Sequence, residues 1–582
     1  MVKRMNNKAL PSFSKGLFSG VILDDLIFPY PQINAEESEN LKMIQDSFRK
    51  FARDRINATE FDAQAQIPEP VLQGLKELGF FGMNIPTEYD GFGLSNTAYV
   101  KMLDLITGIE GGTAITIGAH QSIGLKALLM FGSEEQKKRY LPDLVSGKMI
   151  AAFCLTESGA GSDAAGIKTR AVRDEKAGCY ILNGSKLWIT NGGIADFFTV
   201  FAKETITGND GSAEDKISAF IVTRDMPGVS TGKEEKKLGI KSSSTTALFF
   251  ENVRVPFDNL LGERGKGFKV AMQVLNSGRL GLAGGALGGL KVVFEEALQH
   301  VARRRQFGKT LDQFELIQKK IAQITIDLYA AESMVYLTTD LIDRGDVDYS
   351  LESAMCKIRS TEVAWAGVNE CLQMVGGLGY MKEYPYERAL RDARISTIFE
   401  GTNEILRLFI ALSGMQERGE YLKKIGNALK GPIKGFGLLT EYATQWVKDR
   451  VSAERIRDVH AALAAPKVQF ETWARNLHFS AERALVHHGR DIIYREMILE
   501  RLAESAIDLF AMIATMARVD RCIQEQGAEQ CANEIKICTV FCDQAWRRVR
   551  RNLLMVDSNN DKSLQDIAGY VVKEQKYPFL TF

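Results

Sequence analysis

Helix-like and strand-like segments occupy separate stretches of this 582-residue chain, and that segregation constrains its fold more than any other feature. Residues 35–147 carry apolar side chains at helical spacing, as in 41–48. Short apolar runs between Gly, Asn and Asp turns then span 149–256, and helical patterns return at 267–412 and from 420 to the end. Because strands and helices do not alternate, this order argues against a parallel sheet. The length also exceeds one hydrophobic core, so several domains are expected.

The prediction is a mixed α+β protein that is mainly α. Its strands are expected at 149–155, 180–182, 197–201, 217–222 and 247–250. Helical pieces after them are expected at 268–280, 287–305 and 316–341. The predicted domains are an N-terminal helical domain (1–148), a middle β domain (149–262), a helical domain (263–415) and an additional C-terminal helical domain (416–582).

Charge and cysteine content narrow the classes of function. Lys plus Arg and Asp plus Glu number 73 each, so no global attraction draws the chain to nucleic acid. The eight cysteines form no C-x-x-C pair, which indicates reduced thiols in an intracellular protein. Cys531, Cys538 and Cys542 share one helical face, where a metal site is conceivable but buried small side chains are favoured, and no metal is predicted.

The chain shows no clear membrane-spanning or secretory segment. No run reaches the roughly 18 uninterrupted apolar residues of a membrane-spanning helix. The first eight residues are basic, but they lack the apolar core of a signal peptide. A transit peptide is the weaker alternative, because ordered-looking sequence begins almost at once.

A glycine-bearing loop, TESGAGSD at 156–163, follows the first strand-like run. Gly159 and Gly161 would let backbone N–H groups approach a phosphate or a polar ring edge. The loop fails as a dinucleotide fingerprint because Ala164 stands at the third glycine position and no helix–strand unit follows. Taken alone, a plain strand-ending turn is the more common interpretation.

Two further segments carry candidate cofactor groups. The stretch 183–193, NGSKLWITNGG, opens with a hairpin signal and holds Trp188, which suits either a flat cofactor or a core. The cluster RRRQFGK at 303–309 ends a helix, where cations suit the helix C-terminus itself or a pyrophosphate.

Glu400 lies in IFEGTNE at 398–404, after an apolar run and before Gly401 and Thr402. Acids are favoured in the first turn of a helix, so the residue needs no catalytic role to be explained. Periodicity alone does not separate that role from one as a catalytic base.

Together and in this order, these motifs resemble the acyl-CoA dehydrogenase family. The resemblance includes QMVGGLGY at 373–380 and covers nearly the whole chain. It is strongest to the very-long-chain members and their assembly-factor paralogue, as indicated by FPYP at 28–31, GAHQSIG at 118–124, FCLTE at 153–157 and the additional segment after Gly414. It implies a helical N-terminal domain, a middle β-barrel and a four-helix bundle, with FAD between barrel and bundle.

The resemblance also implies site residues. Those implied to hold FAD are Phe153, Leu155, Thr156, Ser162, Trp188, Ile189, Thr190, Arg304, Phe307, Gln373, Gly377, Thr402 and Glu404. Those implied to bind substrate are Ser162, Arg279 and Gly401. Among the first group, the residues implied to reach the FAD of a neighbouring subunit are Arg304, Phe307, Gln373 and Gly377.

By the same resemblance, Glu400 is the catalytic base that removes the α-proton of an acyl-CoA while the β-hydride passes to flavin N5, giving a trans-2-enoyl-CoA. Some members carry the base on the first bundle helix instead, near Gly278 and Arg279. Here 270–294 contains no Asp or Glu, which leaves Glu400 as the candidate. Desolvation in a dry pocket is expected to raise the pKa of this carboxyl.

The preferred acyl chain is expected to be long. Medium-chain members fill the pocket floor with polar side chains, whereas this chain has Ile115, Gly118 and Ala119 in that region. Close helix packing at Gly118 is the competing explanation, and it explains the glycine nearly as well.

The fourth segment suggests a membrane surface. Residues 421–440 hold Lys423, Lys424, Lys430 and Lys434 and no acid. An apolar helical face follows, made of Leu439, Tyr442, Ala443, Trp446 and Val447. Docking on an anionic membrane and docking on the dehydrogenase body explain this pattern about equally, and the resemblance favours the membrane slightly.

The expected partners are a long-chain acyl-CoA, an electron-transferring flavoprotein and a second copy in a homodimer. The expected location is the cytoplasm, peripheral to the inner membrane, in a bacterium, or the mitochondrial matrix side of the inner membrane in a eukaryote. The competing functions are an acyl-CoA oxidase and a scaffold for respiratory-complex assembly.

Overall fold

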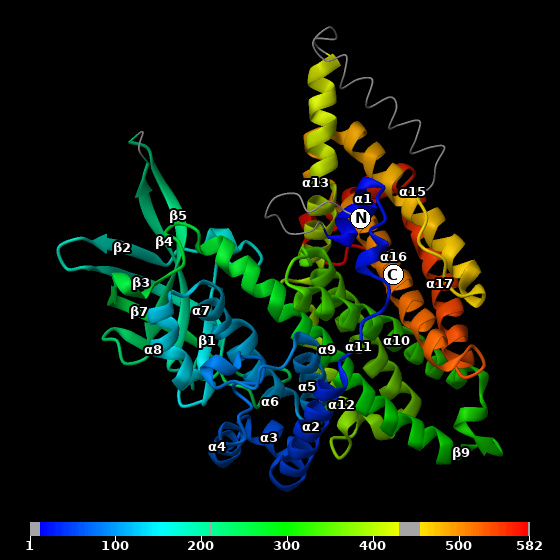
Figure 1. The fold of residues 1–582 in the computed structure, drawn as a ribbon, viewed down its shortest axis with the longest axis horizontal. Coiled ribbons are helices and arrows are strands. Elements are labelled where there is room, and N and C mark those ends of the chain that lie inside the picture. The colour runs from blue at the N-terminus through cyan, green and yellow to red at the C-terminus, as the bar shows by residue number, and fades with distance from the viewer. Residues whose placement is uncertain (1–11, 209–210, 430–453, 580–582) are drawn as a thin grey trace. The chain divides into compact units, whose positions relative to one another are not determined.

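The computed structural model describes residues 12–208, 211–429 and 454–579. Their contacts form two compact units, one of Pro31–Asn403 and one of Ala9–Tyr30 with Glu404–Phe582. Helices precede and follow a single β-rich segment (Figure 1), so the predicted α+β, mainly α architecture is confirmed.

Helices open the first unit. They are α2 (Ala35–Arg55), α3 (Ala58–Gln64), α4 (Glu69–Glu77), α5 (Asn96–Ile109), α6 (Gly111–Gly118), a π-helical turn at Ala119–Gly124, α7 (Lys126–Phe131) and α8 (Glu134–Val145). Side chains at their N-termini explain several starts. Asn34 accepts from the Glu37 N–H at the start of α2, and Ser133 and Gln136 form a reciprocal capping box at the start of α8.

Eight strands then form one sheet. They are β1 (Ala151–Cys154), β2 (Arg170–Asp174), β3 (Cys179–Thr190), β4 (Phe197–Thr207), β5 (Ala213–Thr223), β6 (Val229–Thr231), β7 (Thr245–Pro256) and β8 (Leu260–Leu261). The strand order is β6-β7-β3-β2-β4-β5-β8, with β1 paired to β4. Figure 1 shows these strands gathered together, with α7 and α8 beside them.

Both faces of the sheet are covered by apolar packing. Successive side chains of β4 point to opposite faces. Phe198 and Val200 join a core shared with the N-terminal helices, whereas Phe197 and Phe201 join a core that contains Leu128 and other residues of α7 and α8. The sheet is therefore held in place from two sides, which fixes where its strand ends lie.

The sheet is mainly antiparallel, which agrees with the argument against a parallel sheet, although β1·β4 and a single pair between β2 and β4 are parallel. One expectation about the strands is wrong. The expected hairpin at Asn183–Gly184 does not form, because β3 continues through it with a register shift against β7. A bulge uses the same glycine that a turn would use, so the local signal does not distinguish the two.

The first unit ends in long helices. They are α9 (Gly267–Arg303), α10 (Glu315–Arg344), α11 (Ser350–Val375) and α12 (Pro385–Arg394), with the hairpin β9 (Arg305–Gln306) and β10 (Lys309–Thr310) after α9. The two pieces expected at 268–280 and 287–305 are one continuous helix. Its glycines face α5: a Cβ at Gly284 would lie 2.3 Å from Val100 Cγ1, and one at Gly288 would lie 2.0 Å from the Asp104 carbonyl oxygen.

The second unit is helical. It contains α1 (Phe13–Ser19), all but the first residue of α13 (Asn403–Leu429), α15 (Ala464–His488), α16 (Glu496–Gln526), α17 (Ala532–Asp557) and α18 (Asp561–Glu574). The N-terminal helix α1 packs against α15 and α16, although it lies more than 400 residues from them in sequence (Figure 1).

The cysteines correct one expectation. Cys522 and Cys531 form a disulfide between the end of α16 and the turn before α17, so the prediction of uniformly reduced thiols is wrong for this pair. Cys538 and Cys542 are fully buried on α17, as expected for small core side chains. Sequence reasoning saw Cys531 only as part of a helical face and missed its partner on the preceding helix.

One helical stretch of the described chain, Gly111–Phe131, is long and apolar enough to cross a membrane by length and composition, and 61% of its most apolar window is buried within the protein. Core helices of this kind pass the same test. Of the predicted membrane-surface segment, Lys423 and Lys424 are exposed on α13, whereas Lys430, Lys434 and the apolar face at 439–447 lie outside the described residues.

Candidate active site

Glu400 lies in a loop between the short helical turn Ile395–Thr397 and α13, with its backbone in the left-handed region. Its φ is 56°, and that of Gly401 is 95°. A non-glycine residue held there costs about 1–3 kcal/mol, and such strain concentrates at functional sites. The Oε2 atom of its carboxylate is buried and has no hydrogen-bond partner. A carboxylate oxygen that is buried without a partner, on a strained loop, is a candidate proton acceptor.

The electrostatics of the site favour a base that works near neutrality. Burial raises the pKa of Glu400 to about 7, against the opposing charges of Arg279 and Lys357. Arg279 is 5% exposed, and burial lowers its pKa to about 10. Its Nε donates to the backbone carbonyl of Glu400 (3.2 Å) and its Nη1 to the Asn276 side chain (2.7 Å). The guanidinium therefore holds the loop rather than the carboxylate.

Gly278 on α9 leaves the space that the carboxylate occupies. A Cβ there would lie 3.3 Å from Glu400 Oε2 and 2.7 Å from Ile123 Cγ2. Position 278 of α9 therefore has no room for a side chain, and so none for a carboxylate.

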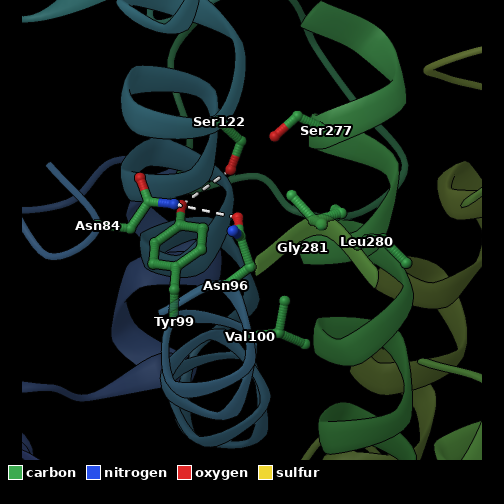
Figure 2. A pocket seen from close by; sticks show the side chains of 9 residues that line it. Asn84, Asn96, Tyr99, Val100, Ser122, Ser277, Leu280 and Gly281 are labelled. Atoms are coloured by element: carbon green, nitrogen blue, oxygen red, sulfur yellow. Dashed lines mark hydrogen bonds between the residues drawn. The ribbon is translucent and has the colours of Figure 1, made fainter. Parts of the chain in front are cut away.

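A small polar cavity lies one turn further along α9 (Figure 2). A Cβ at Gly281 would be 3.4 Å from Ser122 Oγ, and the Ser122 and Tyr99 hydroxyls are 2.8 Å apart. Figure 2 shows Ser277 and Gly281 facing Tyr99 and Ser122 across this space. Gly278, beside the Glu400 carboxylate, and Gly281, beside the Tyr99 and Ser122 hydroxyls, therefore lie on the same face of α9.

The predicted flavin residues of the sheet come together at two strand ends. Thr156 follows β1 and Trp188 lies near the end of β3, and the Leu187 N–H donates to the Thr156 carbonyl (2.9 Å). Trp188 is 61% exposed with φ 57°, at a register shift of β3, whereas Ile189 beside it is buried. The indole of Trp188 is therefore exposed at the edge of the sheet and is suited to stack on a planar ring.

Neighbouring residues complete this edge. Phe153 is half-buried with its ring 4.9 Å from that of Phe201, and Leu155 is buried. Thr190 is half-buried, and Ser162 is exposed in the glycine-bearing loop. A Cβ at Gly159 or Gly161 would meet no atom within 4 Å, so the backbone of this loop is open to a ligand.

A buried ion pair stabilises the glycine-bearing loop at 156–163. Lys186 is fully buried and donates to Glu157 Oε1 (2.7 Å) and to the Leu155 carbonyl (3.1 Å). Glu157 also accepts from the Thr169 hydroxyl and backbone N–H. Burial alone would raise the pKa of Glu157, but these hydrogen bonds outweigh it and lower that pKa.

The remaining predicted residues are more exposed. Arg304, Gln373 and Gly377 are exposed, and Phe307 is 93% exposed at the tip of the β9–β10 hairpin. Gly401 and Thr402 are half-buried in the Glu400 loop, and Glu404 is an exposed residue of the second unit, in α13. The described contacts do not join the four exposed residues to the Glu400 loop, and their assignment to the FAD of a neighbouring subunit stays a prediction.

Sequence reasoning missed three supporting residues: Lys186, Asn276 and Lys357. Lys357 is fully buried on α11 and donates to the Gly401 carbonyl (2.9 Å) and the Asn403 side chain (2.8 Å). The available signal was a charged residue inside an otherwise apolar pattern, as in 354–358 (AMCKI). Within the described residues, no cluster of three or more His, Cys, Asp or Glu side chains is placed to hold a metal ion.

Comparison with known families agrees with the fold and this geometry. Residues 38–148, 152–253 and 265–415 match the N-terminal, middle and C-terminal domains of acyl-CoA dehydrogenases, and 462–577 match the ACAD9/ACADV C-terminal domain. The chain belongs to the acyl-CoA dehydrogenase family, and it is an oxidoreductase.

Individual proteins show how similar this chain is to known members of the family. The very long-chain specific acyl-CoA dehydrogenase of Bos taurus mitochondria is 43% identical over 95% of this chain and 85% of its own length. A crystal structure of an acyl-CoA dehydrogenase complexed with FAD from Bacillus anthracis has a TM-score of 0.80 and 33% identity, covering 97% of this chain and 96% of the other. A chain in a structure of the electron transferring flavoprotein of Acidaminococcus fermentans has a TM-score of 0.61 and 36% identity, covering 66% and 98%.

Proposed function

We propose that this protein catalyses the FAD-dependent α,β-dehydrogenation of long-chain acyl-CoA to trans-2-enoyl-CoA, with Glu400 as the base. The observation that carries the proposal is the buried Oε2 of Glu400, which has no hydrogen-bond partner on a strained loop. The cofactor is FAD, as in the Bacillus anthracis relative.

The groups at the sheet edge fit a flavin. Trp188 offers an exposed aromatic face, and the open backbone at Gly159 and Gly161 offers N–H donors to phosphate or hydroxyl oxygens. Thr156, Ser162 and Thr190 would add hydroxyl contacts. When bound, FAD supplies the acceptor for the hydride that leaves the β-carbon.

Glu400 removes the α-proton. Its raised pKa matches the task, because a base with a pKa near the working pH is still about half carboxylate and gains driving force on protonation. Arg279 donates to the carbonyl of the same residue and so helps to fix this part of the backbone. The Glu400 N–H would then donate to the thioester oxygen as charge develops there.

The space near the loop supports a long acyl chain. A Cβ at Gly118 would meet no atom within 4 Å, so the competing explanation, close helix packing at this glycine, loses its support. Ala119 is small and buried, and Ile115 is apolar. We therefore place the pocket for the distal acyl chain along this helix.

Anaerobic flavin reduction by acyl-CoAs of graded length tests the proposal. Wild-type protein should bleach its flavin fastest with long chains, and Glu400→Gln should lose about 10²–10⁴-fold in rate while retaining FAD. Gly118→Gln should shift the preference to shorter chains. A Glu400→Gln protein as fast as wild type would remove the base assignment, and no reduction by any acyl-CoA would remove the function.

The partners and the location remain proposals that the relatives support. The likeness to a chain from an electron-transferring flavoprotein structure favours that class as acceptor. The exposed Phe307 favours a second copy in a homodimer. The mitochondrial relatives favour a mitochondrial location if the protein is eukaryotic, and we propose contact with the inner membrane there and, from the cytoplasm, in a bacterium. Flotation with anionic vesicles tests the membrane contact, and a protein that does not bind the vesicles would contradict that proposal.

The domain limits 1–148, 149–262, 263–415 and 416–582 are also proposed. Limited proteolysis tests them, because exposed connections are cleaved before packed elements. The limits at 148 and 262 lie outside helices and strands and should be cut first, whereas the limit at 415 lies inside α13, where Met415 is buried, and should resist cleavage.

A further inference from the structure

Lys357 fastens the segment that follows Glu400 to α11. Its ammonium group is fully buried and donates to the Gly401 carbonyl oxygen (2.9 Å) and to Asn403 Oδ1 (2.8 Å). Asn403 is 2% exposed and donates in turn to Thr361 Oγ1 (3.2 Å) and Glu362 Oε1 (3.1 Å), both on α11. The loop that carries the base is thereby tied to one rigid helix.

Two buried cations hold two consecutive carbonyl groups. Arg279 on α9 holds the carbonyl of Glu400, and Lys357 on α11 holds that of Gly401. A left-handed backbone at Glu400 persists only where the surroundings determine it strongly. Clamping both carbonyls from facing helices supplies that constraint.

The same lysine is one of three charged or titratable groups, among the described residues, that interact electrostatically with the Glu400 carboxylate. They are Arg279 on α9, Lys357 on α11 and Tyr99 on α5. Burial raises the pKa of Glu400, and the two cations oppose that rise. Burial raises the pKa of Tyr99 far above its usual value, and Glu400 adds to the rise, so this tyrosine stays neutral.

We propose that Lys357 is a positioning residue for the dehydrogenation: by clamping the Gly401 carbonyl it keeps Oε2 of Glu400 buried and without a hydrogen-bond partner. The inference rests on the proposed function, because it concerns the base of that reaction. In this proposal Lys357 acts through the Glu400 loop and does not touch the substrate.

The test is the limiting rate of anaerobic flavin reduction by palmitoyl-CoA, measured against pH in Lys357→Met and Lys357→Gln. Misplacement of a catalytic group by about 1 Å can cost about 10²-fold, so Lys357→Met should lose about 10–100-fold in limiting rate, with substrate affinity near that of wild type. Lys357→Gln retains a donor and should lose less. In both variants the midpoint of the pH profile should rise by about one pH unit, since the cation is gone.

Lys186→Met is the matched control for deleting a fully buried lysine. It should weaken FAD binding but leave the pH midpoint where it is in wild type. Lys357→Arg keeps the charge with a different head group, so its rate should fall while its midpoint stays. If Lys357→Met does not retain FAD, Lys357→Arg decides: a lower limiting rate at unchanged KM supports the proposal, and a wild-type rate overturns it.

The outcomes separate the two proposals. If Glu400→Gln reduces its flavin as fast as wild type, the base assignment fails and the role of Lys357 fails with it. If Glu400→Gln is inactive but Lys357→Met matches wild type in both rate and pH midpoint, the role of Lys357 alone is overturned. A merely structural lysine would lower stability and leave the pH midpoint unchanged.

Discussion

The flavin side and the base side of the site each rest on a fully buried lysine that holds a backbone carbonyl. On the sheet, Lys186 holds the Leu155 carbonyl and forms an ion pair with Glu157. On the bundle, Lys357 holds the Gly401 carbonyl and the amide oxygen of Asn403. The first cation sits beside a carboxylate that cancels its field, whereas the field of the second reaches the Glu400 carboxylate. We therefore expect the first support to be structural and the second also to affect the proposed base.

Lys186→Met should give the largest loss of stability. It leaves the Glu157 carboxylate buried and unpaired, which costs about 3–5 kcal/mol, and it frees the loop that presents Thr156. Chemical unfolding and FAD retention would measure both effects. Lys216→Met, which removes an exposed ion pair with Glu214 from the same sheet, should cost no more than ~1 kcal/mol. Equal losses in the two variants would show that the buried pair has no special role.

Acid should loosen the support of the flavin side, where His120 ties β1 to α8. This histidine accepts from the Ala151 N–H at the start of β1 (2.9 Å), and its other ring nitrogen lies 3.0 Å from the Leu144 carbonyl. Burial lowers its pKa to about 4, from 6.5 in the unfolded chain. Its contribution is complete above pH 6.5 and is lost as the pH falls toward 4, a change of about 3 kcal/mol.

Urea unfolding at pH 7.5 and pH 4.5 would measure that change. His120→Gln should lose less stability between the two pH values than wild type does, because the titrating group is gone. An unchanged pH dependence in His120→Gln would mean that other groups dominate acid unfolding.

Gly278→Ala should damage the base side selectively. The added methyl would lie 3.3 Å from Glu400 Oε2 and 2.7 Å from Ile123 Cγ2, so the carboxylate must shift, and overpacking of this kind costs about 1–3 kcal/mol. Flavin reduction should slow by roughly tenfold. On the same helix, a Cβ at Gly289 meets only Thr107 Cγ2, at 3.6 Å, so Gly289→Ala should keep the wild-type rate and gain up to ~1 kcal/mol. Similar rates in the two variants would contradict the crowding argument.

Trp188→Ala should have the smallest effect on stability and a clear effect on the flavin. The side chain is 61% exposed, so its loss should change the free energy of unfolding by no more than ~0.5 kcal/mol. FAD affinity, measured by equilibrium dialysis, should fall. Val172→Ala on β2 removes an apolar side chain of the same exposure and should leave FAD affinity unchanged. A Trp188→Ala protein that binds FAD as well as wild type would break the flavin assignment at this edge.

The sequence predicted the strands that carry the site better than the strands that complete the sheet. The runs at 149–155 and 197–201 correspond to β1 and β4, whose apolar side chains form two cores. Strands β2, β6 and β8 were missed because they are short or carry few apolar residues, so their pairing comes from distant partners. The parallel pairing of β1 with β4 joins segments about 45 residues apart, and no local pattern encodes it.

The sequence by itself determined the family, the order of helical and β-rich segments and the identity of the candidate base, because motif residues and periodicity are local properties. The tertiary structure decided that α9 is one helix, since its glycines are explained only by the approach of α5. It also decided how Glu400 is held and charged. Arg279 and Lys357 reach it from α9 and α11, 121 and 43 residues away in sequence, and burial rather than residue type sets its pKa.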